Sequence, residues 1–156
     1  MNIIYNGKKI SDYDYLKVSE TQKQPEIQLN VSPEKIYTLI LHDPNAVNGE
    51  RIHWFRTNIK NNDINTGIDI LPHVGPAPPP KTGKHKYIFG LYEKEFKDVP
   101  ELKEEDRNKY NEIVKTYKIN KPIIEIRFIS QNENGGKKRR TKKNKRRKSK
   151  RTRRRY

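Results

Sequence analysis

The sequence predicts one mainly β domain with a single helix, followed by a tail too polar to join a core. Three segments rich in β-branched and aromatic residues carry the sheet prediction: residues 36–41, 51–59 and 86–93. One later segment has helical periodicity, and no repeat with a period of 20–50 residues is present. A chain of 156 residues has room for one hydrophobic core.

The first half of the chain contains the first strand signals after a polar lead. Residues 25–31 alternate apolar and polar side chains, which is typical of a half-buried strand. Residues 36–41, IYTLIL, are apolar on both faces and predict a central strand that stops at the turn signal Asp43-Pro44-Asn45. Residues 51–59 predict the next strand, with one face formed by His53, Phe55, Thr57 and Ile59.

Prolines separate this strand from the third core strand. Five of them between positions 72 and 80 predict little regular structure over residues 64–84. Residues 86–93, KYIFGLYE, then predict a core strand in which Gly90 indicates either a β-bulge or a close backbone approach.

The last elements of the domain are the helix and one more strand. Apolar residues recur at helical spacing over residues 101–118, and acidic residues in the first turns suit the helix dipole. Pro122 forces an extended backbone, and residues 123–129 alternate as a final strand. We expect the domain to occupy residues 1–132.

A basic tail over residues 133–156 carries almost all of the net charge. Fifteen of the 35 Lys and Arg residues stand in the last 20 positions, which hold no Asp or Glu; the other 20 basic residues face 19 acidic ones. Such a block repels itself and is expected to be disordered. It predicts contact with nucleic acid or an acidic membrane surface, or a nuclear-localisation signal, and the sequence leaves these alternatives open.

The composition excludes several classes of site. Without cysteine there is no disulfide, thiolate metal site or cysteine nucleophile. The first residues do not resemble a secretory signal, and no apolar run reaches membrane-spanning length. We therefore expect an intracellular, cytoplasmic protein, with the nucleus or a virion as alternatives through the tail. The abundance of Asn, Ile and Lys is typical of A/T-rich genomes, such as those of some large DNA viruses, protists and bacteria.

Three polar residues stand at ends of the predicted core strands. Asp43 follows one strand, while His53 and His85 stand where the next two begin. If these strands are neighbours, the three side chains converge, and the carboxylate is expected to raise the pKa of both imidazoles. Two imidazolium donors suit a phosphate or carboxylate group, and Tyr87 on the same face as His85 adds a hydroxyl. Affinity is then expected to weaken as the pH rises through the histidine pKa values.

The proline-rich stretch before His85 predicts a stiff wall for this pocket. Proline fixes φ and lowers the entropy lost on folding, while Gly75 and Gly83 permit turns that other residues resist. Alternatives remain for the two histidines and the aspartate. They could bind a metal, or a histidine could act as the base of a hydrolase, although no serine stands at a nucleophile elbow.

Four short motifs in a fixed order resemble the phosphatidylethanolamine-binding proteins, a family that includes the Raf kinase inhibitor proteins and the plant flowering regulators. The resemblance covers residues 1–132. The motifs are Asp43-Pro44-Asn45-Ala46, His53-Trp54, Gly75-Pro76-Ala77-Pro78-Pro79 and Gly83-Lys84-His85-Lys86-Tyr87.

The resemblance implies both a fold and a site. The fold would be a large antiparallel sheet packed on a smaller one. The pocket would be lined by Asp43, His53, His85 and Tyr87, with a rim around Gly75–Pro79. It would bind phospholipid head groups or a phosphorylated partner such as a kinase, in a regulatory role, with no catalysis and no cofactor. The competing hypothesis is a nucleic-acid-associated or virion-packaging protein that acts through its tail.

Four departures from the family pattern concern the pocket. Asn45 replaces a second aspartate, and Val47 replaces the closing proline. Arg51 stands where the family usually has an aromatic residue, so that it either contacts the anion or points to solvent. The basic tail takes the place of a C-terminal helix that flanks the pocket in animal members.

Overall fold

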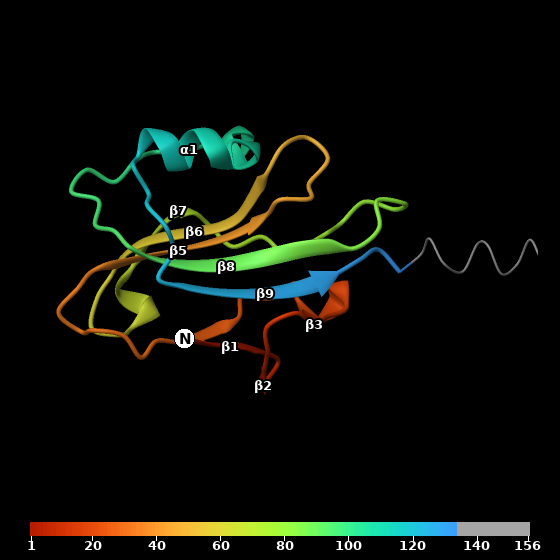
Figure 1. Ribbon diagram of the computed structural model, residues 1–156, viewed down its shortest axis with the longest axis horizontal. Coiled ribbons are helices and arrows are strands. Elements are labelled where there is room, and N and C mark those ends of the chain that lie inside the picture. Colours follow the sequence, from red (N-terminus) through yellow and green to blue (C-terminus); the bar gives the residue numbers. More distant parts are fainter. Residues whose placement is uncertain (134–156) are drawn as a thin grey trace, which may run out of the picture.

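The computed structural model describes residues 1–133, which form two β-sheets and a helical layer (Figure 1). The outcome for the predicted tail beyond residue 133 lies outside the described residues. Within residues 1–133, no helix has the length and hydrophobicity that a membrane crossing requires. The strands are β1 (Asn2–Tyr5), β2 (Lys8–Lys9), β3 (Asp14–Tyr15), β4 (Glu26–Gln28), β5 (Tyr37–Asp43), β6 (Arg51–Ile59), β7 (Ile68–Leu71), β8 (His85–Glu93) and β9 (Ile124–Ser130).

The large sheet has six strands in the order β3-β9-β8-β5-β6-β7. All seven residues of β5 are buried, which confirms the prediction of a central strand. Its pairs are antiparallel, as the resemblance implied, except for the short strand β3, which runs parallel to β9. The two-residue strand β3 is too short to produce a sequence period, and it was not predicted.

The small sheet has the order β2-β1-β4 and covers one face of the large sheet, as Figure 1 shows. Only β4 was predicted among its strands. Side chains of both sheets form one hydrophobic core between them, in which Ile3 and Ile27 of the small sheet pack with Leu39 and Phe89 of the large one. This arrangement confirms a large sheet packed on a smaller one.

The other face of the large sheet is covered by the helical layer. The predicted helix over residues 101–118 is instead a 3₁₀ turn, Glu104–Asn108, followed by the α-helix α1 (Tyr110–Thr116). Lys109 between them departs from helical geometry, with φ −114° and ψ 32°. Arg107 in the 3₁₀ turn is fully buried against the sheet, an anchoring contact that a periodicity pattern does not predict.

Two predictions for the sheet need correction or completion. Residues 64–84 were expected to be irregular, but the segment contains a 3₁₀ turn (Ile64–Thr66) and β7, because the prolines begin only at Pro72. At Gly90 the structure shows no bulge; instead, a neighbouring side chain approaches the glycine closely. The strand register is regular there, and a Cβ on Gly90 would lie 2.9 Å from the Tyr92 ring.

A β-bulge in β6 changes which side chains share a face. Leu41 pairs with Trp54 while His42 pairs with Ile52, so His53 is the extra residue of β6. Such a bulge re-aims the side chains on either side of it. The predicted common face of His53 and Phe55 is therefore wrong: Phe55 belongs to the core beneath the helical layer, whereas His53 contacts Tyr87.

Candidate functional site

A cavity of about 320 Å³ opens where β5 ends and β6 and β8 begin. All six residues predicted for the site line it, namely Asp43, His53, Gly75, Pro79, His85 and Tyr87. The other lining residues are Ala46, Val47, Asn48, Arg51, Val74, Ala77, Pro78 and Asn108. The apolar residues among them come mainly from two loops, and the ionisable residues come from the three strands.

Asp43 is held by the turn that follows β5. Its Oδ1 accepts a hydrogen bond from the backbone N–H of Asn45 at 2.7 Å, the turn bond that the Asp-Pro-Asn signal predicted. The Asn45 side chain in turn accepts a bond from the backbone N–H of Lys86 at 2.9 Å, which joins the turn to β8. The substitution of asparagine for the family's second aspartate thus leaves an uncharged side chain with a structural contact.

His85 is hydrogen-bonded at both ring nitrogens. Nδ1 lies 2.7 Å from Asp43 Oδ2, and Nε2 lies 2.8 Å from the Thr82 hydroxyl. That hydroxyl donates its one proton to the Pro79 carbonyl at 2.7 Å, so it must accept from Nε2. With Asp43 ionised, His85 therefore carries two protons and forms a buried ion pair with Asp43.

His53 has a different environment from the one predicted. Its Nδ1 lies 3.2 Å from the carbonyl oxygen of Val74, not against Asp43. Burial, with the nearby charges of Arg51 and Arg107, lowers the pKa of His53 to about 4. The expectation that one carboxylate raises the pKa of both imidazoles is thus wrong for His53, which is neutral at pH 7. Because a carbonyl only accepts, the single proton of this ring lies on Nδ1.

Tyr87 both packs in the core and lines the cavity. Its ring stacks on Phe128 with centroids 5.1 Å apart and meets the His53 ring edge-on at 5.3 Å. Burial and the charge of Asp43 raise the pKa of Tyr87, so its hydroxyl keeps the proton that it can donate to a ligand.

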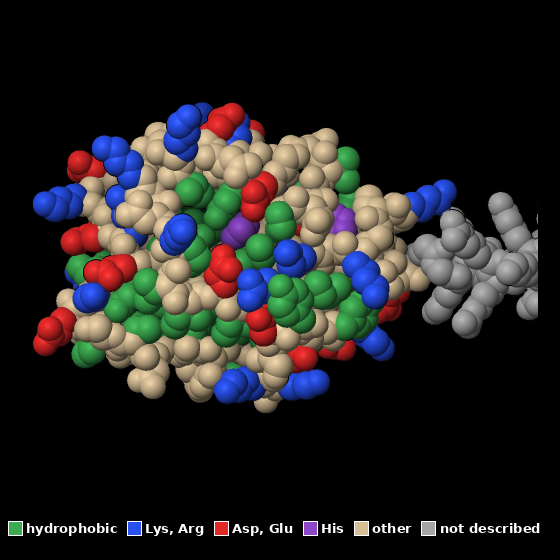
Figure 2. Space-filling view, in the orientation of Figure 1, with side chains coloured by type: hydrophobic (Ala, Val, Ile, Leu, Met, Phe, Trp, Pro, Cys, Tyr) green, Lys and Arg blue, Asp and Glu red, His purple; other side chains and the backbone are tan. Residues whose placement is uncertain are grey.

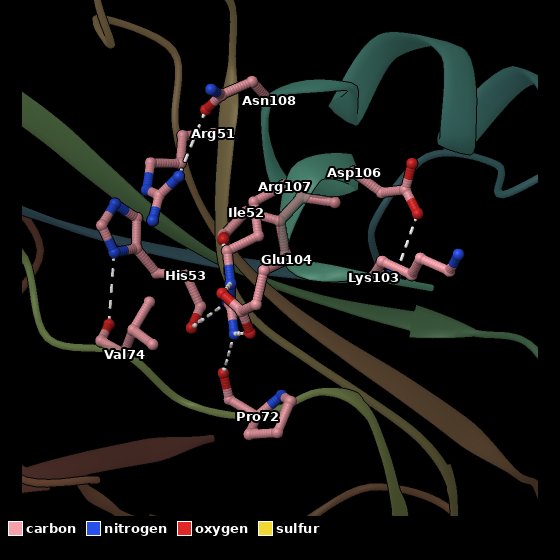
Figure 3. A network of polar contacts seen from close by, with 10 residues as sticks. All are labelled: Arg51, Ile52, His53, Pro72, Val74, Lys103, Glu104, Asp106, Arg107 and Asn108. Carbon is pink, nitrogen blue, oxygen red and sulfur yellow. Dashed lines mark hydrogen bonds and ion pairs between the residues drawn. The ribbon is translucent and has the colours of Figure 1, made fainter. Parts of the chain in front are cut away.

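Arg51 lines the cavity, and its guanidinium bonds to a neighbouring side chain of the 3₁₀ turn. It lies 3.4 Å from Asn108 Oδ1, and Figure 3 shows it beside the His53 ring. Within residues 1–133, no carboxylate forms an ion pair with Arg51. This residue, which departs from the family pattern, therefore places an unneutralised positive charge at the pocket.

The loop that forms the rim is pinned from several sides. Gln22 Nε2 donates to the Pro76 carbonyl at 2.7 Å, and Val74 N–H donates to the His53 carbonyl at 2.8 Å. Gly75 does not have a positive φ, so the predicted turn does not require it; close approach does, because a Cβ there would lie 2.8 Å from the Gln22 Cα. Gly83, with φ +77°, supplies the predicted turn before β8. These contacts support the interpretation of the proline-rich stretch as a fixed wall.

Arg107 ties this wall to β6 from the opposite face of the sheet. Its guanidinium donates to the carbonyls of Ile52, His53 and Pro72 at 3.1, 3.3 and 2.8 Å, and to the Glu104 carboxylate (Figure 3). Arg107 therefore fixes the backbone of His53 and the start of the loop without lining the cavity.

Sequence reasoning missed the residues that orient the site. Thr82 holds His85, Asn108 holds Arg51, and Arg107 holds His53; the last two contacts join residues more than 50 positions apart in the sequence. The one available signal was the position of Thr82 three residues before His85, within the motif-bearing loop.

The remaining histidines lie outside the cavity. His42 Nδ1 is 2.6 Å from Glu50 Oε1, and its ring stacks on Tyr110 with centroids 4.0 Å apart. His73 meets the Trp54 ring edge-on, and burial lowers its pKa to about 4. No group of three or more His, Cys, Asp or Glu residues suited to a metal ion occurs within residues 1–133.

Comparisons with known proteins agree with the fold and the motifs. Residues 2–129 match the phosphatidylethanolamine-binding protein family. The chain is 25% identical to the protein TERMINAL FLOWER 1 of Arabidopsis thaliana, over 89% of this chain and 83% of that protein. It is 30% identical to a 26 kDa secreted antigen of Toxocara canis over 56% of this chain, but it spans only 36% of the antigen.

Among solved structures, a phosphatidylethanolamine-binding protein from Plasmodium vivax superimposes with a TM-score of 0.68. The two chains are 21% identical, with 85% of each covered, so this likeness concerns the fold alone. Since the family match spans the whole two-sheet domain, from β1 into β9, the chain belongs to the phosphatidylethanolamine-binding protein family.

Proposed function

We propose that the cavity reversibly binds a phosphate- or carboxylate-bearing group, on a phospholipid head group or a phosphorylated partner, in a regulatory role without catalysis. The observation that carries this proposal is the joint placement of Arg51, His53, His85 and Tyr87 around one cavity that the loops leave open. Family membership supports a binding protein of this kind.

The polar groups of the pocket suit an anion in three ways. The Arg51 guanidinium supplies a permanent positive charge and several donors. The Tyr87 hydroxyl supplies a neutral donor, and the His85 imidazolium, whose charge is balanced by Asp43, also lines the cavity. Apolar loop residues such as Val47 and Pro78 form the remaining wall, which suits a ligand whose anionic end continues into a less polar part.

Titration of the full chain with O-phosphorylethanolamine tests the proposal. Histidine imidazole NMR is the appropriate readout, because all four histidines lie within residues 42–85 and none lies in the basic tail. Saturable shifts of the His53 and His85 signals are expected, with binding lost in His53→Ala and His85→Ala. Unchanged histidine signals in a folded protein at millimolar ligand would contradict the proposal.

A second candidate function rests on the composition of the tail. The last 20 residues hold 15 Lys and Arg, whereas residues 1–136 have nearly balanced charge. Figure 2 shows acidic and basic side chains interspersed over the face drawn, with no large area of one sign. We propose that the tail binds a polyanion such as nucleic acid without reading its sequence, since no aromatic residue interleaves the charges before Tyr156.

Gel-shift titration of one duplex DNA at 50 and 200 mM salt separates the two candidates. Neutralisation of 6–10 phosphates lowers affinity by roughly 10³–10⁵ between these salt concentrations. A chain that ends at residue 133 should lose this binding and keep its histidine NMR spectrum. If the shortened chain still binds DNA, the activity does not belong to the tail.

A further inference from the structure

We infer that Arg51 and His53 make the pocket select phosphate monoesters over phosphodiesters and carboxylates. This inference rests on the anion-binding function proposed above and narrows its ligands to phosphorylated groups, at the expense of carboxylates and of phospholipid head groups, which are phosphodiesters. It follows from the charges around the cavity and from the hydrogen-bonding state of one nitrogen atom.

The first step concerns charge. His85 and Asp43 neutralise each other at 2.7 Å, and both side chains are at least 95% buried. Asp43 and His85 therefore contribute little net charge to a ligand in the cavity. Arg51 is left as the cation that has no ion-pair partner within residues 1–133, and its guanidinium is held by Asn108 of the 3₁₀ turn. The guanidinium attracts the anionic oxygens of a phosphate monoester whether the monoester carries one negative charge or two, so the preference over a phosphodiester arises at His53.

The second step concerns the free nitrogen of His53. Nδ1 donates to Val74, so Nε2 of the neutral ring carries a lone pair and no proton. Nε2 has no hydrogen-bond partner among residues 1–133, and the residue lines the cavity. A ligand group that meets Nε2 must bring a proton with it or induce the ring to take one.

The surroundings of His53 oppose the uptake of a proton from water. Arg51 on β6, Arg107 on the 3₁₀ turn and His73 after β7 all disfavour a charge on the ring, as does burial. With a pKa of about 4, about one His53 ring in a thousand is protonated at pH 7. Asp43 lies in the same cavity, but its Oδ2 is already bonded to His85.

Phosphate monoesters can supply the proton that His53 Nε2 lacks. Their second ionisation has a pKa of about 6, so a monoester at neutral pH brings a proton at low cost and shares it with Nε2. A phosphodiester has no such proton, and a carboxyl group with a pKa of about 4 has lost its own. These ligands would place an oxygen lone pair against the lone pair of Nε2. The remaining oxygens of the monoester can accept hydrogen bonds from Arg51, which lines the same cavity.

A matched pair of small ligands tests the inference on the full chain. O-phosphorylethanolamine is a monoester, and glycerophosphorylethanolamine carries the same head group as a diester. Both are titrated at pH 7 with histidine imidazole NMR as the readout, which excludes the tail because it contains no histidine. Long-range ¹H–¹⁵N spectra also report whether His53 Nε2 gains a proton in the complex.

The monoester is expected to bind at least about tenfold more tightly than the diester, because one charge-assisted hydrogen bond distinguishes them. Arg51→Met should weaken monoester binding by about tenfold or more, and His53→Gln should reduce the preference. Arg51→Lys retains the charge and should keep part of the affinity. Arg56→Met is the matched control, because Arg56 lies on the same strand, pairs with Asp69 and does not line the cavity.

The possible outcomes distinguish monoester selectivity from the more general proposal that the cavity binds anions. Equal affinities for the two esters, with shifts of His53 and His85 in both titrations, would overturn the selectivity and leave anion capture standing. Unchanged histidine signals with either ester would overturn anion capture itself. An unchanged monoester affinity in a folded Arg51→Met protein would remove Arg51 from the site.

Discussion

Consecutive residues of β5 each take part in a hydrogen bond between a histidine and a carboxylate, on opposite faces of one sheet. His42 contacts Glu50 at 2.6 Å beneath the helical layer, and Asp43 contacts His85 at 2.7 Å beside the cavity. The histidine is buried in both pairs. By distance and burial alone, the two pairs would be assigned the same role.

The neighbours of each pair decide what it can do. The His42 ring is covered by the Tyr110 ring, and its Nε2 is buried with no partner in residues 1–133. The His85 ring is held by Thr82 of the loop that lines the cavity. A histidine–carboxylate pair therefore indicates a ligand site only where an adjacent cavity exists, and elsewhere it is a packing feature.

The largest expected effect comes from breaking each pair in turn. Asp43→Ala leaves the buried His85 without its carboxylate, and we expect the free energy of unfolding to fall by about 3–5 kcal/mol, with phosphate binding lost. His42→Phe keeps a ring stacked on Tyr110. The Glu50 carboxylate loses its partner but can be hydrated, because 16% of its side chain is exposed. That change should cost only about 1–2 kcal/mol and spare binding.

Urea denaturation followed by the fluorescence of Trp54, the single tryptophan, measures both losses. If His42→Phe abolished phosphate binding in a protein that retains its fold, the His42–Glu50 pair could not be a packing feature alone.

The next effect tests whether the two faces are independent. Arg107 approaches from the helical layer but bonds to the carbonyls of Ile52, His53 and Pro72. Arg107→Met should lower the free energy of unfolding by about 3 kcal/mol, because buried carbonyls lose their donor. Unlike His42→Phe, it should also weaken phosphate binding, since it loosens His53. Arg127→Met is the control, because the side chain of Arg127 on β9 makes its contacts at the surface, with Asp12, Glu125 and the Tyr13 ring.

The strands and the cavity residues could be predicted from the sequence for a physical reason. Burial on both faces of β5 leaves a continuous apolar run, and a strand end followed by Asp-Pro leaves a turn signal. Strand ends in one sheet meet at one edge, so Asp43, His53 and His85 were placed together correctly. Two-residue strands such as β3 contain too few residues to show a period.

The protonation state of the site could not be predicted in the same way. It depends on the β-bulge at His53, which no alternation pattern reveals, and on the Val74 carbonyl that this bulge meets. It depends also on Arg107, whose buried guanidinium disfavours a positive charge on the His53 ring. Burial of the ring, together with the positive charges of Arg51 and Arg107, lowers the His53 pKa against the expected direction, although the Val74 hydrogen bond alone would raise it.

A smaller effect concerns the pH dependence of stability, to which the buried ring of His53, bonded to a carbonyl and not to a carboxylate, contributes. Its folded-state pKa of about 4 lies below the ordinary 6.5, so between these values the unfolded chain binds a proton that the folded chain does not. The stability from this group is complete above about pH 6.5 and is lost as the pH falls towards 4. Between pH 7 and 4.5 the native protein should lose about 2–3 kcal/mol more than His53→Gln in urea denaturation. Parallel losses in the two proteins would mean that His53 is not buried in its neutral form.

The smallest effect isolates the contact that distinguishes His85 from His42. Thr82→Val removes the acceptor of the His85 Nε2 proton and the donor to the Pro79 carbonyl, while the loop keeps its prolines. We expect about 1 kcal/mol of lost stability and a several-fold loss of phosphate affinity, with Thr82→Ser close to the native protein because it keeps the hydroxyl. The His85 imidazole signals should shift in the free protein, whereas those of His42 should not, since Glu50 and Tyr110 are untouched. An equal shift of both histidines would show that the two pairs communicate through β5, and that the faces of the sheet cannot be treated as separate sites.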